Sequence, residues 1–166
     1  AFVGSIVAVK NVTILQPLFH EIQSRLHSPV KFWIIGDGKM RHTIEPALLD
    51  DKTIDVKFWG NLPAEDMPDI MNCIDVVVLP SLNEGLGMVC AEAIRCGASA
   101  VGSAAGGLPE VVGNEFVVPL GEDFVTEMAD LIAGILTSRP EQKIPESLDW
   151  NRTAAIELDY LKSVAR

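Results

Sequence analysis

The chain contains few cysteines and histidines, with three of each among its 166 residues. The cysteines are Cys73, Cys90 and Cys96, an odd number with no C-x-x-C pair among them. This set does not fit a disulfide framework or a zinc site, and the histidines have no ligand-type neighbours at metal-binding spacing. We therefore expect no metal site, and a reducing compartment, the cytoplasm, as the location.

Positive charge and long apolar runs are also scarce. The 13 Lys and Arg residues oppose 23 Asp and Glu residues, which gives a net charge of −10. This balance disfavours non-specific binding to nucleic acid or to an anionic membrane, although one local positive site can still hold a small anion. The longest uncharged stretch, 96–109, is rich in glycine, alanine and serine. It is shorter than the about 18 apolar residues of a membrane span, so we expect none.

The abundant feature is apolar sequence in a regular alternation of strand and helix patterns. Hydrophobic residues make up 48% of the chain, and at about 150 residues per domain the length predicts one domain. The expected strands are 2–9, 30–35, 54–59, 75–79, 99–101 and 116–119. The expected helices are 12–26, 39–49, 65–73, 88–96, 108–112, 123–136 and 150–164. This alternation predicts an α/β fold with a doubly wound, mainly parallel, six-stranded Rossmann-like sheet.

Two segments are expected to meet at one edge of this sheet. If the strand order is 3-2-1-4-5-6, the first and fourth strands are neighbours at the topological switch point, where ligands bind. Lys10 follows the first strand, and the turn 81–87 follows the fourth. Gly85 and Gly87 precede a helix, where exposed N–H groups and the helix dipole favour a phosphate. The alternative is an ordinary tight turn between a strand and a helix.

Glu92 lies in the helix that follows this turn. Its neighbours three and four residues away are mostly apolar or small, which predicts that its carboxylate lies on or beside the core-facing stripe. A buried carboxylate needs a partner. That partner is either Arg95, three residues later, or a pair of ligand hydroxyls such as a ribose diol. Glu84, eight residues earlier, would lie about 12 Å away along a helix axis.

These residues also form a recognisable motif. The stretch Pro80-Ser81-x-x-Glu84-Gly85-x-Gly87-x-x-x-x-Glu92-Ala93 resembles the Glu-x7-Glu motif of retaining GT-B glycosyltransferases of family 4, the glycosyl transferases group 1. Four further segments are similar to that family in order and spacing, and the resemblance covers nearly the whole chain. They are 35–38, 58–62, 97–101 and 106–112.

The resemblance implies a single nucleotide-sugar-binding domain, 1–166, that ends in a C-terminal helix, 151–166. It would be the donor-binding, C-terminal half of a two-domain enzyme whose N-terminal, acceptor-binding half is its partner. The substrate would be a nucleoside diphosphate sugar, with no cofactor, no metal and a role in carbohydrate biosynthesis. Any membrane contact would come through that other half, and this chain alone would not transfer sugar.

The resemblance also implies roles for individual residues. Lys10 would stabilise the diphosphate and Glu84 would contact the transferred sugar, which makes these two the candidate catalytic residues. Glu92 would bind the ribose hydroxyls. The backbone of Gly85, Leu86 and Gly87 would cradle the phosphate and the sugar. Asn61 and Leu62 would line the base.

The sequence departs from the family at the phosphate-binding cations. Ser5 stands where the family usually has Arg, and Asn11 follows Lys10 where Gly is usual. Lys39 or Arg41 is a candidate to compensate. The Ser5 departure leaves a second interpretation open, a nucleotide-sugar-binding module without catalysis. A dinucleotide-dependent oxidoreductase is disfavoured, because no glycine follows the first strand.

Overall fold

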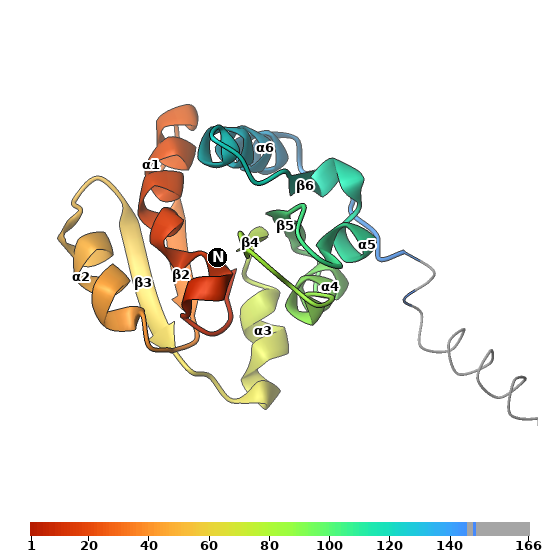
Figure 1. The fold of residues 1–166 in the computed structure, drawn as a ribbon, viewed down its shortest axis with the longest axis horizontal. Helices are drawn as coiled ribbons and strands as arrows, with labels where there is room; N and C mark the ends of the chain where they lie inside the picture. The colour runs from red at the N-terminus through yellow and green to blue at the C-terminus, as the bar shows by residue number, and fades with distance from the viewer. Residues whose placement is uncertain (146–147, 149–166) are drawn as a thin grey trace, which may run out of the picture.

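The computed structural model describes residues 1–145 and 148 and contains one six-stranded sheet in which every pairing is parallel. The order is β3-β2-β1-β4-β5-β6, so the strand order and fold class predicted from the sequence are confirmed (Figure 1). The strands are β1 (Phe2–Val3), β2 (Lys31–Ile35), β3 (Asp55–Gly60), β4 (Val76–Leu79), β5 (Ser99–Ser103) and β6 (Val117–Val118). β4 is apolar and buried along its whole length, as a central parallel strand requires.

Helices cover both faces of the sheet. They are α1 (Leu15–Arg25), α2 (Arg41–Asp50), α3 (Met67–Met71), α4 (Met88–Arg95), α5 (Leu108–Val112) and α6 (Phe124–Ser138). Short 3₁₀ turns lie at Ala8–Lys10, Val12–Ile14, Ala64–Asp66 and Asn114–Phe116. Helices α1 and α6 pack side by side against one face, where Phe19 and Phe32 stack with ring centroids 4.2 Å apart (Figure 1). On the other face, Met71 of α3 and Ala93 of α4 pack against Val77 of β4.

The first strand is shorter than the sequence predicts. The expected strand 2–9 is wrong beyond Val3, because the chain leaves the sheet at Gly4, which has a φ of +147°. The following backbone bonds to the loop after β2 instead: the Ile6 amide donates to the Asp37 carbonyl, and the Ile6 carbonyl accepts from the Met40 amide. Lys10 therefore lies on the 3₁₀ turn Ala8–Lys10 and not directly after a strand.

The expected helix 39–49 is present as α2, but the break that Pro46 predicts near its end does not occur, because Pro46 lies inside a helix that continues to Asp50. Pro46 and His42, whose carbonyl would otherwise accept an amide N–H, are both exposed, so water can satisfy the freed carbonyl. The expected C-terminal helix falls in 149–166, outside the residues that the structure describes. Among the described helices, none has the length and apolar character needed to cross a membrane.

Candidate functional site

The two segments expected at the switch point do meet at the carboxyl edge of the sheet. Strands β1 and β4 are neighbours, and the Leu82 amide donates a 2.8 Å hydrogen bond to the carbonyl of Val9. This bond ties the turn after β4 to the turn after β1. Lys10 and Glu84, which are 74 residues apart in the chain, form an ion pair there. Their side chains are only 20% and 14% exposed, so the pair lies in a partly dehydrated position.

The Glu84 carboxylate is held by more than Lys10. The Ser81 hydroxyl donates a 3.1 Å hydrogen bond to Glu84 Oε2, the same oxygen that contacts Lys10. Ser81 is fully buried, and its carbonyl accepts a hydrogen bond from the Ser103 hydroxyl at the end of β5. Sequence reasoning missed the roles of both serines. The available signal was a serine just after the apolar strand β4 and another at the last position of β5, where a buried hydroxyl requires a partner.

The loop after β5 closes tightly on the same segment. Gly106 has a φ of +59°, and a Cβ atom there would lie 1.7 Å from the Glu84 carbonyl oxygen. The Gly107 amide donates to the Gly85 carbonyl at 2.7 Å and to the Glu84 carbonyl at 3.2 Å. The Gly-Gly pair therefore fixes the backbone of Glu84 and Gly85. The sequence pattern had identified these glycines only as part of a family resemblance.

The glycine-rich turn presents backbone to solvent at the start of α4. Gly85 and Leu86 are exposed, whereas Gly87 is buried with a φ of +64°. A Cβ atom on Gly87 would lie 2.4 Å from the Leu108 side chain, so both the conformation and the packing require glycine. No side chain of the described residues caps α4. The N-terminus of α4, which carries partial positive charge, therefore begins four residues after Glu84, at the edge where Lys10 and Glu84 pair.

Cys90 lies beneath this turn and is fully buried. Burial raises the pKa of its thiol to about 12, and the nearby charge of Glu84 adds to that shift. The thiol is therefore protonated at neutral pH and packs as a small apolar group. Cys90 is therefore not a candidate nucleophile.

The burial predicted for Glu92 is wrong. Glu92 is exposed, because the four buried residues of α4 occupy the opposite side of the helix. Met88, which the sequence reasoning counted as a core neighbour, is 45% exposed. Arg95 is also exposed, and no ion pair joins it to Glu92 among the described salt bridges. The salt-bridge explanation of Glu92 therefore fails, and its carboxylate is open to a ligand.

Asn61 and Leu62 follow β3 at the same carboxyl edge, but two strands away from β1. Asn61 is exposed, and Leu62 is half-buried against a cluster that includes Trp59. The structure places them along the edge that also carries Lys10, on the far side of β2. Their backbone groups can therefore line one end of a ligand that extends along this edge.

Lys39 and Arg41, the candidates to compensate for the arginine that Ser5 replaces, differ in whether their charge is free to bind a phosphate. Arg41 donates two 2.8 Å hydrogen bonds to the Glu45 carboxylate and lies 3.4 Å from Asp37. The hydrogen bonds to Glu45 raise the pKa of the Arg41 guanidinium, so this cation is already neutralised. Ser5 and Lys39 are exposed, and within the described part of the chain no ion pair engages Lys39.

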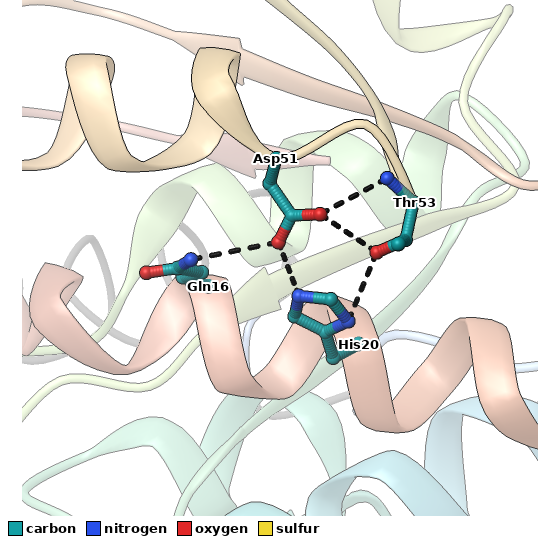
Figure 2. Close-up of polar contacts among 4 residues, drawn as sticks. All are labelled: Gln16, His20, Asp51 and Thr53. Carbon is teal, nitrogen blue, oxygen red and sulfur yellow. Dashed lines mark hydrogen bonds and ion pairs between the residues drawn. The ribbon is translucent and has the colours of Figure 1, made fainter.

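A second polar cluster lies away from this edge and links α1 to the turn before β3 (Figure 2). Asp51 contacts His20 and accepts 2.7 and 3.0 Å hydrogen bonds from the hydroxyl and amide of Thr53. Gln16 reaches the same carboxylate at 3.5 Å. These hydrogen bonds, led by that of the Thr53 hydroxyl, lower the pKa of Asp51 to about 2. The cluster joins two elements and has the character of a structural clamp.

Residues 1–138 match the sequence profile of the family described as glycosyl transferases group 1, so the chain belongs to that family. The chain is 39% identical over 98 residues to 2-deoxystreptamine N-acetyl-D-glucosaminyltransferase of Streptomyces fradiae, covering 55% of this chain and 23% of that protein. It is 32% identical over 142 residues to D-inositol 3-phosphate glycosyltransferase of Salinispora tropica, covering 78% and 30%. It therefore spans less than a third of either relative.

Solved structures show the same fold. HepE of Anabaena, in complex with UDP and glucose, has a TM-score of 0.66 at 24% identity and matches 83% of this chain and 38% of that one. The pneumococcal O-GlcNAc transferase GtfA, in complex with UDP and GlcNAc, has a TM-score of 0.70 at 17% identity, with 83% and 28% matched. At these identities the likeness concerns the fold. That fold is the six-stranded, parallel, Rossmann-like α/β sheet with helices on both faces.

Proposed function

We propose that this chain, a member of the glycosyl transferases group 1 family, is the donor-binding half of a retaining family 4 glycosyltransferase. The enzyme would move a sugar from a nucleoside diphosphate sugar to an acceptor hydroxyl. The observation that carries the proposal is the Lys10–Glu84 pair in front of the glycine-rich start of α4. One cation, one carboxylate and the N-terminus of a helix there match a diphosphate joined to a sugar.

Lys10 and the N-terminus of α4 would stabilise the departing diphosphate. During transfer, the bond from the anomeric carbon to the diphosphate oxygen breaks and a bond to the acceptor oxygen forms on the same face. The acceptor proton leaves with the diphosphate. Negative charge therefore grows on the diphosphate oxygens, where Lys10 and the α4 N–H groups can stabilise it without reorganising. Burial of the Lys10 side chain strengthens this interaction relative to one in water.

Glu84 would position the transferred sugar. Its carboxylate is fixed by Ser81 and by the glycines that hold its backbone, which is the rigidity a positioning group needs. Sugar hydroxyls can donate to this carboxylate once the diphosphate has taken Lys10. The ion pair seen here would thus keep both groups in place until the donor arrives.

The other donor contacts follow along the same edge. Glu92 is exposed on α4 and would accept hydrogen bonds from the ribose hydroxyls. The backbone at Asn61 and Leu62 would line the base. HepE and GtfA, which share the fold, were each solved with UDP and a sugar, which supports a nucleotide sugar as the ligand class.

The remaining parts of the proposal concern the whole enzyme. An acceptor-binding N-terminal domain would form the facing wall of the cleft. Leu82, Leu86 and Met88 are exposed apolar residues around the site, and they are suited to such a wall. We propose a cytoplasmic enzyme of carbohydrate biosynthesis that needs no metal. Among residues 1–145 and 148, no group of three potential metal ligands comes together.

Calorimetry of the chain with UDP, ADP and GDP in EDTA tests the donor-binding role. At least one of these should bind. Lys10→Met should weaken that binding about tenfold to a hundredfold, as expected when a charge-assisted hydrogen bond to phosphate is lost. Lys52→Met is the matched control, because Lys52 is exposed and precedes β3 at the opposite sheet edge. Its affinity should be unchanged.

Three outcomes would contradict this proposal in different ways. Binding that appears only after magnesium or manganese is added would show that the site needs a metal. No binding by any nucleoside diphosphate, with or without metal, would remove the donor-binding role. Equal losses for Lys10→Met and Lys52→Met would show that only the net charge of the chain matters.

A further inference from the structure

Lys10 and Glu84 are partners of each other in an ion pair at the carboxyl edge of the sheet. Under the proposed function they have separate ligand groups, because Lys10 binds the diphosphate and Glu84 binds the transferred sugar. A diphosphate that binds Lys10 therefore removes the counter-ion of Glu84. The affinity of the site depends on what the ligand offers to Glu84 in exchange.

The Glu84 carboxylate is held in place independently of Lys10. The Ser81 hydroxyl donates a 3.1 Å hydrogen bond to Oε2, the oxygen that Lys10 also contacts. The Glu84 carbonyl accepts from the Gly107 amide at 3.2 Å, and a Cβ atom on Gly106 would lie 1.7 Å from that carbonyl oxygen. Lys10, in contrast, carries its charge on a flexible four-carbon stem. When the pair separates, Lys10 therefore moves and Glu84 stays.

The fixed carboxylate depends on its donors, because water solvates it only in part. The Glu84 side chain is 14% exposed. A carboxylate offers about four sites to hydrogen-bond donors, and among the described residues Lys10 and Ser81 donate to it. Loss of Lys10 leaves the Ser81 hydroxyl as the donor from that part of the chain. A partly buried charge that loses its counter-ion is destabilised unless new donors replace it.

A nucleotide sugar and a nucleoside diphosphate differ in the group that they bring to Glu84. The nucleotide sugar brings sugar hydroxyls, which donate hydrogen bonds to a carboxylate. The nucleoside diphosphate ends in a phosphate that carries additional negative charge at neutral pH and has no hydrogen-bond donor when it is ionised. This phosphate repels the carboxylate and does not replace Lys10 as its partner.

We propose that Glu84 is a specificity-determining residue that makes the site prefer a nucleotide sugar to the corresponding nucleoside diphosphate. This role rests on the proposed function and works through an exchange of partners. The diphosphate of the donor binds Lys10, and the sugar hydroxyls take the place of Lys10 on Glu84. After the sugar has been transferred, Glu84 lacks those hydroxyls, and Lys10 returns from the diphosphate to the carboxylate.

The same exchange promotes release of the product. The nucleoside diphosphate competes with the Glu84 carboxylate for the ammonium of Lys10, whereas the donor satisfies both groups. In many enzymes product release limits turnover, so a carboxylate that competes with the product for its cation favours the next cycle. The ion pair thus has a function beyond holding the two side chains in position.

Glu84→Gln tests this exchange, because it removes the charge but keeps the shape and an oxygen that can accept from Ser81. Glu122→Gln is the control for net charge, at an exposed carboxylate that follows β6 on the same sheet edge. Calorimetry of the full chain compares UDP, ADP and GDP with UDP-glucose, UDP-N-acetylglucosamine, ADP-glucose and GDP-mannose. The measured quantity is the affinity for each nucleotide sugar relative to its nucleoside diphosphate.

Glu84→Gln should tighten the binding of the nucleoside diphosphate about tenfold, because Lys10 then has no competing carboxylate. The affinity for the matching nucleotide sugar should change less or fall, since its hydroxyls lose a charged acceptor. The preference for the nucleotide sugar should therefore fall about tenfold. Glu122→Gln should leave both affinities unchanged.

Three results would overturn the inference. An unchanged or weaker affinity of Glu84→Gln for the nucleoside diphosphate would show that Lys10 binds the diphosphate and Glu84 at the same time. Equal tightening for both ligands, or the same tightening in Glu122→Gln, would show that the variant only removes negative charge. Failure of the donor-binding role is distinct from these results, because the parent chain would then bind none of the nucleoside diphosphates, and the exchange would fall with it.

Discussion

The two edges of the central sheet have opposite chemistry, although they are separated by only the length of a strand. The carboxyl edge holds a partly buried ion pair, Lys10 with Glu84, and the N-terminus of α4. The amino edge holds an apolar groove between α1 and α6, with Phe19 and Ile132 in its wall. The two edges can therefore be perturbed separately.

The winding of the chain explains this difference. In a parallel sheet every crossover helix begins near the carboxyl edge and ends near the amino edge. Positive helix ends therefore gather where ligands bind, and an anionic ligand finds N–H donors only there. The amino edge offers helix C-termini and side-chain packing. Changes at the amino edge should thus alter stability, and changes at the carboxyl edge should alter ligand affinity.

The largest expected effect comes from the amino edge. Phe19→Ala removes a buried ring that stacks on Phe32, and it should lower the free energy of unfolding by about 3–5 kcal/mol. Urea denaturation measures this loss. Leu49→Ala, at an exposed position, should change it by less than about 0.5 kcal/mol. The affinity of the folded Phe19→Ala chain for a nucleoside diphosphate should stay unchanged. A large loss of affinity would show that changes at the amino edge also affect ligand binding at the carboxyl edge.

A smaller effect is expected at the carboxyl edge. Glu92→Gln should weaken nucleoside diphosphate binding by about 1.5–3 kcal/mol, because a ribose diol donates more strongly to a charged carboxylate than to an amide. Arg95→Ala, one helical turn away and also exposed, is the control and should leave affinity unchanged. Calorimetry compares the two variants. If Arg95→Ala costs as much as Glu92→Gln, ribose recognition by Glu92 is the wrong explanation.

The smallest effect concerns the cluster of Figure 2. The pKa of Asp51 is lowered to about 2, below the about 3.9 of an unfolded aspartate, so its ionised form stabilises the fold above about pH 4. This contribution disappears as pH falls from about 4 to 2. Asp51→Asn should therefore lower Tm at neutral pH, and the difference from the parent should narrow over that acid range.

The matched control for the clamp is Asp50→Asn, at the exposed neighbouring carboxylate. It should leave the acid dependence of Tm unchanged. Thermal unfolding between pH 7 and about pH 2 measures both variants. A Tm difference for Asp51→Asn that stays constant across this range would show that the hydrogen bonds to Thr53 and His20 do not favour the charged form.

Sequence reasoning was most successful where local pattern and chain handedness decide the outcome. The strand order and the meeting of Lys10 with the turn after β4 are both confirmed. It failed where the direction of one side chain mattered. Glu92 has apolar neighbours along the helix, but the buried face of α4 is on the other side, so the expected burial was wrong. Helix α4 is only eight residues long and contains several small residues, so its hydrophobic periodicity does not distinguish the buried face from the exposed one.

The sequence by itself determined the alternating α/β fold and the glycine turn at the switch point, because hydrophobic period and the right-handed crossover rule depend on local chemistry. Only the tertiary structure decided that Ser81 and Ser103 support Glu84, and that Gly106 lies against its backbone. Only the tertiary structure showed that the chain leaves β1 after Val3 and that Ile6 bonds to the loop after β2 instead. These features depend on contacts between segments distant in the chain, whose register no local pattern specifies.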